Sequence, residues 1–188
     1  MTMTSKKGRL FIISAPSGAG KGTVIQRLLE LRPELKLSVS ATTRAPRAGE
    51  KDGVSYFFVT REKFIDMIAR GEFLEHAEYV GEYYGTPKKP IYELIDAGKD
   101  VIIEIEVWGA RQVMAIDPGA VSIFIMPPDM DELERRLRER GTDIEQKLAV
   151  RLECARTEIE HQGEYAHVVI NDEVDRVAKE VLAIIDGE

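Results

Sequence analysis

The sequence contains a single cysteine, Cys154, and it has no long apolar run. An intramolecular disulfide is therefore impossible, and the protein does not require an oxidising compartment. No stretch approaches the roughly 18 consecutive apolar residues that a membrane helix needs. The segment before Gly8 also lacks the apolar centre of a signal peptide. These absences predict a soluble, cytoplasmic protein without a membrane partner.

The chain also lacks an excess of positive charge. Its 26 Lys and Arg residues are outnumbered by 33 Asp and Glu residues, and the net charge is -7. Bulk charge of this sign argues against binding to nucleic acid, although it leaves room for a local cationic pocket. The length of 188 residues suits one domain, or one domain that carries a small insertion. Nothing in the sequence indicates the oligomeric state.

Short apolar runs alternate with helical patterns along most of the chain. The first run, 10–13, is followed by a glycine-rich stretch and by a helical pattern over 23–31. Further strands are expected at 101–105, 121–125 and 168–170, and further helices at 89–97, 110–116, 130–138, 144–162 and 174–185. This alternation predicts an α/β fold, with a parallel sheet and right-handed crossovers.

The segment 37–87 breaks the alternation. It has a strand pattern with polar positions at 54–59, turn signals at Ala48-Gly49 and Asp52-Gly53, and one helical pattern over 60–69. We interpret it as a small mixed α+β insertion in a core made of residues 1–36 and 88–188.

A glycine-rich loop lies between the first strand and the first helix. Its residues are Ala15, Pro16, Ser17, Gly18, Ala19, Gly20, Lys21, Gly22 and Thr23. Glycines let backbone N–H groups surround phosphate oxygens, and the following helix adds its dipole. Lys21 can reach the terminal phosphates as a point charge. A plain strand-to-helix turn is the alternative, but so many small residues around one lysine serve no packing purpose. The loop predicts a nucleoside triphosphate site.

The loop departs from the G-x-x-x-x-G-K-S/T pattern at both ends. Ala15 replaces the first glycine, and Gly22 occupies the Ser/Thr position that usually ligates Mg²⁺. A direct hydroxyl ligand could come only from Thr23, with a shifted loop. Otherwise we expect phosphates, water and nearby acids to hold the Mg²⁺ that accompanies ATP.

The stretch 38–50 contains two arginines that flank Pro46, among several hydroxyl side chains. It reads Ser-Val-Ser-x-Thr-Thr-Arg-x-Pro-Arg-x-Gly-Glu, and it resembles the signature of guanylate kinases. The resemblance extends over nearly the whole chain. It includes Gly53-x-x-Tyr56-x-Phe58-Val59, Phe73-Leu74-Glu75, Tyr83-Tyr84-Gly85-Thr86, Arg136-x-x-x-Arg140-Gly141 and Val169-Ile170-Asn171-Asp172. It implies a P-loop core, an inserted GMP-binding segment, a short arginine-bearing helical lid at about 136–151, and phosphoryl transfer from ATP to GMP.

The resemblance also implies a binding site for GMP. Arginine forks suit a phosphate dianion, and the family match assigns Arg44 and Arg47 to it. An ionised carboxylate at Glu75 accepts hydrogen bonds from guanine N1–H and its 2-amino group, and adenine has neither donor on that edge. The implied GMP-binding set is Ser40, Arg44, Arg47, Glu50, Tyr56, Glu75, Tyr84, Thr86, Glu104 and Glu106. Without the resemblance, Glu75 and the two arginines would be read as surface charge.

Two members of this set depart from the family pattern. Family members commonly carry aspartates where this chain has Glu104 and Glu106, and a glutamine where it has Trp108. Strand alternation is expected to place the two glutamates on one face, near the acceptor nucleoside and, through water, near Mg²⁺.

The helical patterns after residue 130 are rich in arginine. Surface charge is the simple interpretation, and we retain it for Arg135 and Arg138. The resemblance implies that lid arginines stabilise the transferred phosphoryl group when the site closes. The implied catalytic set is Lys21, Arg44, Arg136, Arg140 and Arg151, and the implied contacts to the adenine of ATP are Asn171 and Asp172.

Two other functions remain open from the sequence. Guanylate-kinase-like domains of scaffold proteins bind peptides without catalysis, but they typically lose phosphate-loop residues that this chain keeps. A kinase of another small acceptor, such as AMP, could use the same core. Glu75 together with Ser40 and Thr86 argues against that reading.

Overall fold

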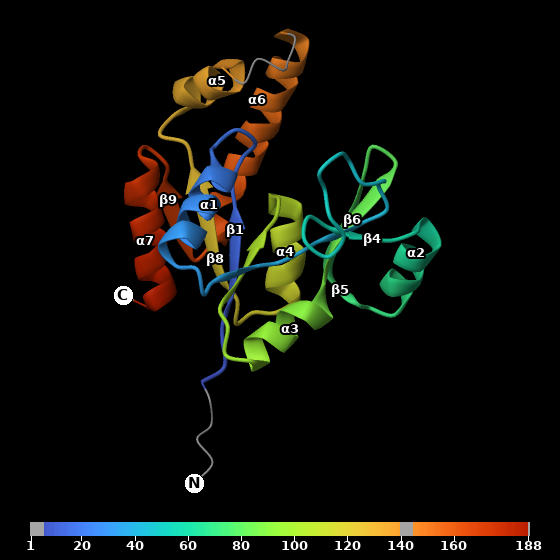
Figure 1. The fold of residues 1–188 in the computed structure, drawn as a ribbon. Coiled ribbons are helices and arrows are strands. Elements are labelled where there is room, and N and C mark those ends of the chain that lie inside the picture. The colour runs from blue at the N-terminus through green and yellow to red at the C-terminus, as the bar shows by residue number, and fades with distance from the viewer. Residues whose placement is uncertain (1–5, 140–144, 188) are drawn as a thin grey trace.

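A computed structural model describes residues 6–139 and 145–187 of the chain. Its core is a parallel sheet in the order β2-β7-β1-β8-β9 (Figure 1). These strands are β1 (Leu10–Ser14), β2 (Lys36–Leu37), β7 (Val101–Glu104), β8 (Val121–Met126) and β9 (His167–Ile170). The predicted α/β core is therefore confirmed, and β2 supplies its edge strand.

Helices cover both faces of this sheet. They are α1 (Lys21–Leu31) and α7 (Val174–Asp186) on one face, and α3 (Lys88–Asp96) and α4 (Val107–Ile116) on the other. The side chains of β1 alternate between the two layers, since Phe11 and Ile13 pack with α1 and α7 while Leu10 and Ile12 pack with α3 and α4. Because β1 is buried on both faces, it reads as a continuous apolar run.

The insertion forms a second sheet in the order β4-β3-β6-β5. It consists of β3 (Ala41–Thr42), β4 (Phe57–Phe58), α2 (Arg61–Ala69), β5 (Phe73–Tyr79) and β6 (Glu82–Pro87). The strand expected over 54–59 is wrong except at Phe57–Phe58. Gly53 has φ 72°, and the N–H groups of Val54 and Ser55 both donate to the Lys51 carbonyl. The first half of the expected strand is therefore part of a turn.

Two further helices project from the core. They are α5 (Met130–Glu139) and α6 (Glu145–Glu160), followed by the short helix η1 (His161–Glu164). Buried leucines of α5 and α6 pack in one small cluster: Leu133, Leu137, Leu148 and Leu152. The predicted lid begins within α5 and ends within α6, and its middle, 140–144, lies outside the described residues together with Arg140.

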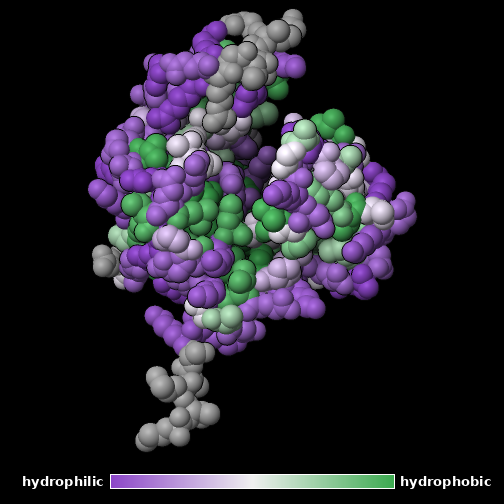
Figure 2. All heavy atoms as spheres, viewed as in Figure 1, coloured by the Kyte–Doolittle hydropathy of each residue, from purple (hydrophilic) through white to green (hydrophobic). Residues whose placement is uncertain are grey.

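These parts leave a cleft between the core and the insertion, and Figure 2 shows that face of the molecule hollowed between them. The chain crosses from core to insertion after β2, and it returns where β6 leads directly into α3. β2 ends one residue inside the predicted insertion, and the division at 37 and 87 stays a prediction. In the described part of the chain, no helix is long and apolar enough to cross a membrane.

Helix α1 offers a matched test of the core. Leu28 is fully buried between the sheet and α7, whereas Leu31 on the same helix is 39% exposed. We expect Leu28→Ala to lower the free energy of unfolding by about 2–5 kcal/mol. Leu31→Ala is the control and should cost less than about 1 kcal/mol. Urea denaturation followed by circular dichroism measures both, and equal losses would contradict this packing.

Candidate active site

Two glycines of the phosphate loop adopt a backbone conformation that residues with a side chain rarely adopt. Gly18 and Gly20 have φ values of 94° and 91°, in the left-handed region. A Cβ atom on Gly20 would lie 2.6 Å from Asn171 Nδ2, so any larger residue would collide with this buried side chain. Helix α1 begins at Lys21, directly after Gly20, and its first N–H groups therefore point toward the loop.

Two side chains from other elements hold the loop through the carbonyl of Ala19. That oxygen accepts a hydrogen bond from Asn171 Nδ2 at 2.7 Å and another from Arg136 Nη1 at 3.2 Å. Arg136 also donates to the Asn171 carbonyl at 2.9 Å and to Glu132 at 2.7 Å. Two predicted site residues thus brace the loop in this conformation. Asn171 Oδ1 is buried without a hydrogen-bond partner in the described part of the chain.

A cavity of about 450 Å³ opens beside this brace. It lies between α5, the phosphate loop and the end of β9, where a nucleotide base has room. Its lining brings together six residues expected to bind ATP or act on it: Gly18, Gly20, Thr23, Arg136, Asn171 and Asp172. Asp172 is exposed and accepts from Arg176 Nε at 2.7 Å.

Lys21 lies in a neighbouring cavity of about 310 Å³. Its ammonium donates to the carbonyl of Ile105 at 2.8 Å, and Ser14 Oγ donates to the same oxygen at 2.7 Å. Burial lowers the pKa of Lys21. Three nearby carboxylates oppose that shift: Glu104, Glu106 and Glu158. The ammonium is therefore fixed by a neutral acceptor within a negatively charged surrounding.

Glu104 and Glu106 both line this cavity, but not for the reason expected from the sequence. β7 ends at Glu104, and Glu106 precedes the first turn of α4. Strand alternation therefore does not reach Glu106. The turn from the strand into α4 brings both carboxylates to the cavity. Thr23 lines the other cavity, apart from these acids.

The predicted phosphate-binding arginines lie in the loop before β4. Arg44 Nη2 donates to both carboxylate oxygens of Glu50, at 2.8 and 3.0 Å, and Arg47 donates its backbone N–H to the same carboxylate at 2.7 Å. The Arg44 hydrogen bond lowers the pKa of Glu50. The Arg44 guanidinium lies 5.5 Å from the centre of the Tyr56 ring, and that ring lies 6.2 Å from Tyr84. Four predicted residues therefore meet here, and the side chain of Arg47 is exposed.

Glu75 occupies a buried position that the sequence marks only through the family match. It is 9% exposed and pairs across β5 and β6 with Thr86, whose hydroxyl donates to Glu75 Oε1 at 2.5 Å. Burial raises the pKa of Glu75, and the charge of Glu106 raises it further. A Cβ on Gly109 would lie 3.1 Å from Glu75 Oε2, so this glycine makes room for the carboxylate. Ser40 lies just before β3, where its carbonyl accepts from Phe57 N.

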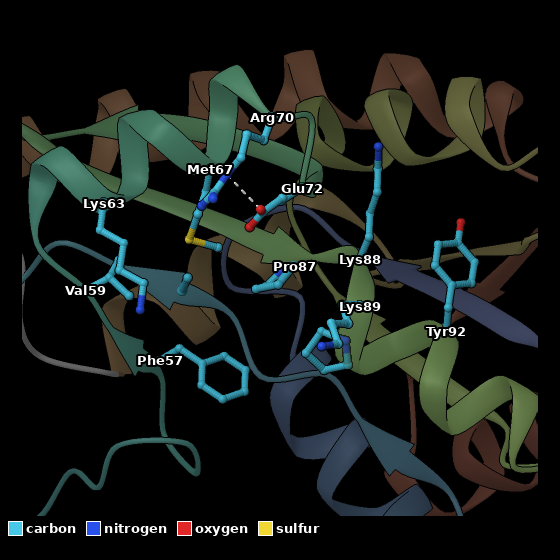
Figure 3. A pocket seen from close by; sticks show the side chains of 12 residues that line it. Phe57, Val59, Lys63, Met67, Arg70, Glu72, Pro87, Lys88, Lys89 and Tyr92 are labelled. Carbon is cyan, nitrogen blue, oxygen red and sulfur yellow. Dashed lines mark ion pairs between the residues drawn. The ribbon is translucent and has the colours of Figure 1, made fainter.

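A larger cavity, of about 610 Å³, lies on the opposite face of the insertion sheet (Figure 3). Alternation along β6 turns Tyr84 and Thr86 to one face and Pro87 to the other, and Pro87 lines this cavity with Phe57 and Met67. None of the predicted site residues lines it.

Two site residues were missed by the sequence reasoning. Glu158 of α6 accepts from the Ser17 N–H at 3.1 Å, and Gly109 contacts Glu75. A glutamate on a charged helix carries no local signal, so only the tertiary structure reveals the first. Arg151, which was predicted, donates to Ser17 Oγ at 2.9 Å. Within 6–139 and 145–187, no three His, Cys, Asp or Glu side chains converge in a way that could hold a metal ion.

Comparisons with known proteins identify the family of this chain. The family model described as guanylate kinase matches residues 7–188. A guanylate kinase from Clostridioides difficile (strain 630) is 48% identical over 99% of this chain and 91% of its own length. One from Synechococcus sp. (strain CC9902) is 51% identical over 93% of each chain.

A solved structure agrees as well. The crystal structure of guanylate kinase from Anaplasma phagocytophilum has a TM-score of 0.75 and 36% identity, covering 98% of this chain and 88% of that one. A family model that matches nearly every residue, together with relatives this similar over nearly full length, shows that the chain belongs to the guanylate kinase family.

Proposed function

We propose that this protein transfers the terminal phosphoryl group of ATP to GMP, with dGMP as a second acceptor, and releases ADP and the nucleoside diphosphate. Family membership supports the reaction. One observation carries the assignment of the cleft: Glu106 lines the cavity of Lys21, and Gly109, in the first turn of the α4 helix that follows Glu106, lies against the Glu75 carboxylate. The phosphate-binding and base-reading positions are therefore neighbours.

The donor nucleotide is proposed to bind along the phosphate loop. The terminal phosphates replace the Ile105 carbonyl as the partner of Lys21, and the base lies in the cavity beside Asn171 and Asp172. Arg151 already contacts the loop through Ser17, and Arg136 is bonded to the loop at Ala19. We assign both, together with Arg140, to charge stabilisation during transfer.

Magnesium is proposed to accompany ATP. The oxygen donors of Glu104 and Glu106 suit Mg²⁺, which commonly keeps several water ligands in phosphate sites. They lie in the Lys21 cavity and Thr23 does not, so we favour the acids over the Thr23 hydroxyl as its holders. When bound, the ion offsets negative charge on the phosphates.

GMP is proposed to bind through its phosphate at Arg44 and through its base at Glu75. The phosphate takes the place that the Glu50 carboxylate occupies on Arg44, with Arg47, Tyr56 and Tyr84 around it. Guanine donates to Glu75, whose other contact, the Thr86 hydroxyl, fixes the carboxylate. Ser40 completes the base site.

The chemistry needs no nucleophile from the protein. An oxygen of the GMP phosphate forms a bond to the terminal phosphorus of ATP while the bond to the ADP oxygen breaks. The protein aligns the two nucleotides and stabilises the charge.

We expect a cytoplasmic location and no nucleic-acid partner. An acceptor panel of GMP, dGMP, AMP, CMP and UMP in a coupled ADP-release assay tests the function, and preference for an acceptor other than GMP or dGMP would refute it.

Lys21→Ala should lower kcat about 10²–10³-fold in a folded protein, because it removes a preorganised charge from the transferred group. The Lys21 ammonium donates to a backbone carbonyl, that of Ile105, and this contact does not build the core, so the fold should survive. The coupled assay and circular dichroism measure both properties. Lys89→Ala, an exposed change on α3, is the control. Near-normal turnover in folded Lys21→Ala would contradict the donor assignment.

Arg44→Ala should weaken GMP binding about 10- to 100-fold, since a charge-assisted hydrogen bond contributes about 1.5–3 kcal/mol. Arg47→Ala should act in the same direction, and ATP affinity should change less than about twofold in either variant. Calorimetric titration with each nucleotide separates these effects. Arg70→Ala, on the same segment but paired with Asp66 and Glu72, is the matched control. An equal loss of ATP affinity would place these arginines outside the acceptor site.

Glu75→Gln should reduce kcat/KM for GMP strongly and narrow the GMP-to-AMP ratio, because an acceptor is replaced by a donor. Sites built for such hydrogen bonds can discriminate by about 10⁴–10⁵. Protonation of Glu75 removes an acceptor for guanine, so GMP affinity should fall as the pH is lowered. Because the pKa of Glu75 is raised, this loss should begin at a higher pH than it would for a glutamate with an ordinary pKa. Thr86→Ala should have a smaller effect. Unchanged GMP-to-AMP selectivity in Glu75→Gln would show that the base is read elsewhere.

A further inference from the structure

Two side chains of α6 hold the same residue of the phosphate loop. Arg151 Nη2 donates to Ser17 Oγ at 2.9 Å, and the Ser17 N–H donates to Glu158 Oε2 at 3.1 Å. Residues seven apart lie two turns apart on one face of a helix. Helix α6 is therefore attached to the loop along that face, by one contact to the Ser17 side chain and one to its backbone.

The contact made by Glu158 is of the kind that a phosphate makes. Backbone N–H groups of such loops bind anionic oxygens, and here the anion is a carboxylate. Glu158 is half-buried and lines the cavity of Lys21 with Glu104 and Glu106. Burial raises its pKa, and the Ser17 N–H and the charge of Lys21 oppose that shift. Since Lys21 donates to Ile105, the cavity holds several carboxylates around an ammonium that is hydrogen-bonded to a neutral oxygen.

We propose that Glu158 is a positioning residue that occupies the place of a terminal phosphate oxygen when nucleotide is absent, and that ATP must displace it. This inference rests on the proposed function, because it takes the loop as the ATP site. Two consequences follow. The carboxylate opposes ATP by like charge until it leaves, and its departure removes one of the two contacts between α6 and the loop, so that phosphate binding is coupled to the position of α6.

The chain carries its own reporter of that release. Trp108, the single tryptophan, is half exposed, and its ring centre lies 4.9 Å from that of His161, directly after α6. The Arg111 guanidinium lies 5.5 Å from the Trp108 ring and pairs with Glu164 of η1 at 2.9 Å. A displacement of the carboxyl end of α6 therefore changes the surroundings of the indole, and with them its fluorescence emission.

The charge effect is tested with Glu158→Gln, which keeps the shape and an acceptor for the Ser17 N–H. Calorimetric titration with ATP, without Mg²⁺ and without GMP, should show about tenfold tighter binding than in the unmodified protein. GMP affinity should stay within about twofold. Glu153→Gln makes the same charge change on the same helix, where Glu153 is exposed and paired with Arg156, and it should leave ATP affinity unchanged.

The release is tested with Glu158→Ala, which removes the bond to Ser17. Its nucleotide-free Trp108 emission should move toward that of the ATP-saturated unmodified protein, and Glu153→Ala should not shift it. ATP affinity in Glu158→Gln that is equal to or weaker than in the unmodified protein would overturn the proposal, as would unshifted emission in Glu158→Ala. Failure of the unmodified protein to bind ATP would instead refute the proposed function. Thermal unfolding of each variant confirms that it is folded.

Discussion

The carbonyl oxygen of Ala19 is the point on which the donor site depends. It accepts from Asn171, at the end of β9, and from Arg136 of α5, so one atom joins the phosphate loop to the sheet and to the lid. The neighbouring Gly20 must be left-handed and without a side chain for Asn171 to approach. The pattern of small residues in the loop follows from this contact as much as from the need to surround phosphate. A change at Asn171 would therefore alter the loop before it altered any contact to a base.

The surroundings of Arg44 and of Glu75 differ in how the charge of each side chain is balanced. In the proposed acceptor loop, Arg44 is paired with Glu50, so an arriving phosphate would exchange with that carboxylate. In the proposed base site, Glu75 is buried with one hydroxyl partner, and its charge is stabilised less than it would be in water. The first arrangement favours anions of suitable shape. The second favours a ligand that brings two N–H donors, and guanine does.

Much of the core could be predicted from the sequence, because strands such as β1 and β8 are buried on both faces and helices such as α1 carry a regular apolar stripe. The phosphate loop was also recognisable, because its glycines and its lysine lie close together in the sequence. The strand predicted at 54–59 was wrong over its first half, because those residues form a turn that begins near Gly53. Glu106 reached its cavity through a turn and not through strand alternation, and Glu158 arrived from a helix distant in sequence. Such contacts are set by packing between elements, which single-sequence periodicity does not contain.

The excess of carboxylates around Lys21 affects which form of ATP, free or bound to a metal ion, the proposed donor site favours. Glu104, Glu106 and Glu158 all act on one ammonium, so the cavity repels a bare triphosphate. A nucleotide that carries a divalent cation has a smaller net negative charge. Because electrostatic repulsion scales with the charge of the ligand, the cation reduces the repulsion between the nucleotide and the glutamates. Under the proposed function, the charges of the glutamates thus favour the metal complex of ATP over the free anion, and this effect is separate from any bond that Glu104 or Glu106 makes to the ion. Gly22, where related loops place a hydroxyl ligand, is consistent with this division, because selection then rests on the field of the cavity and needs no direct bond from the loop.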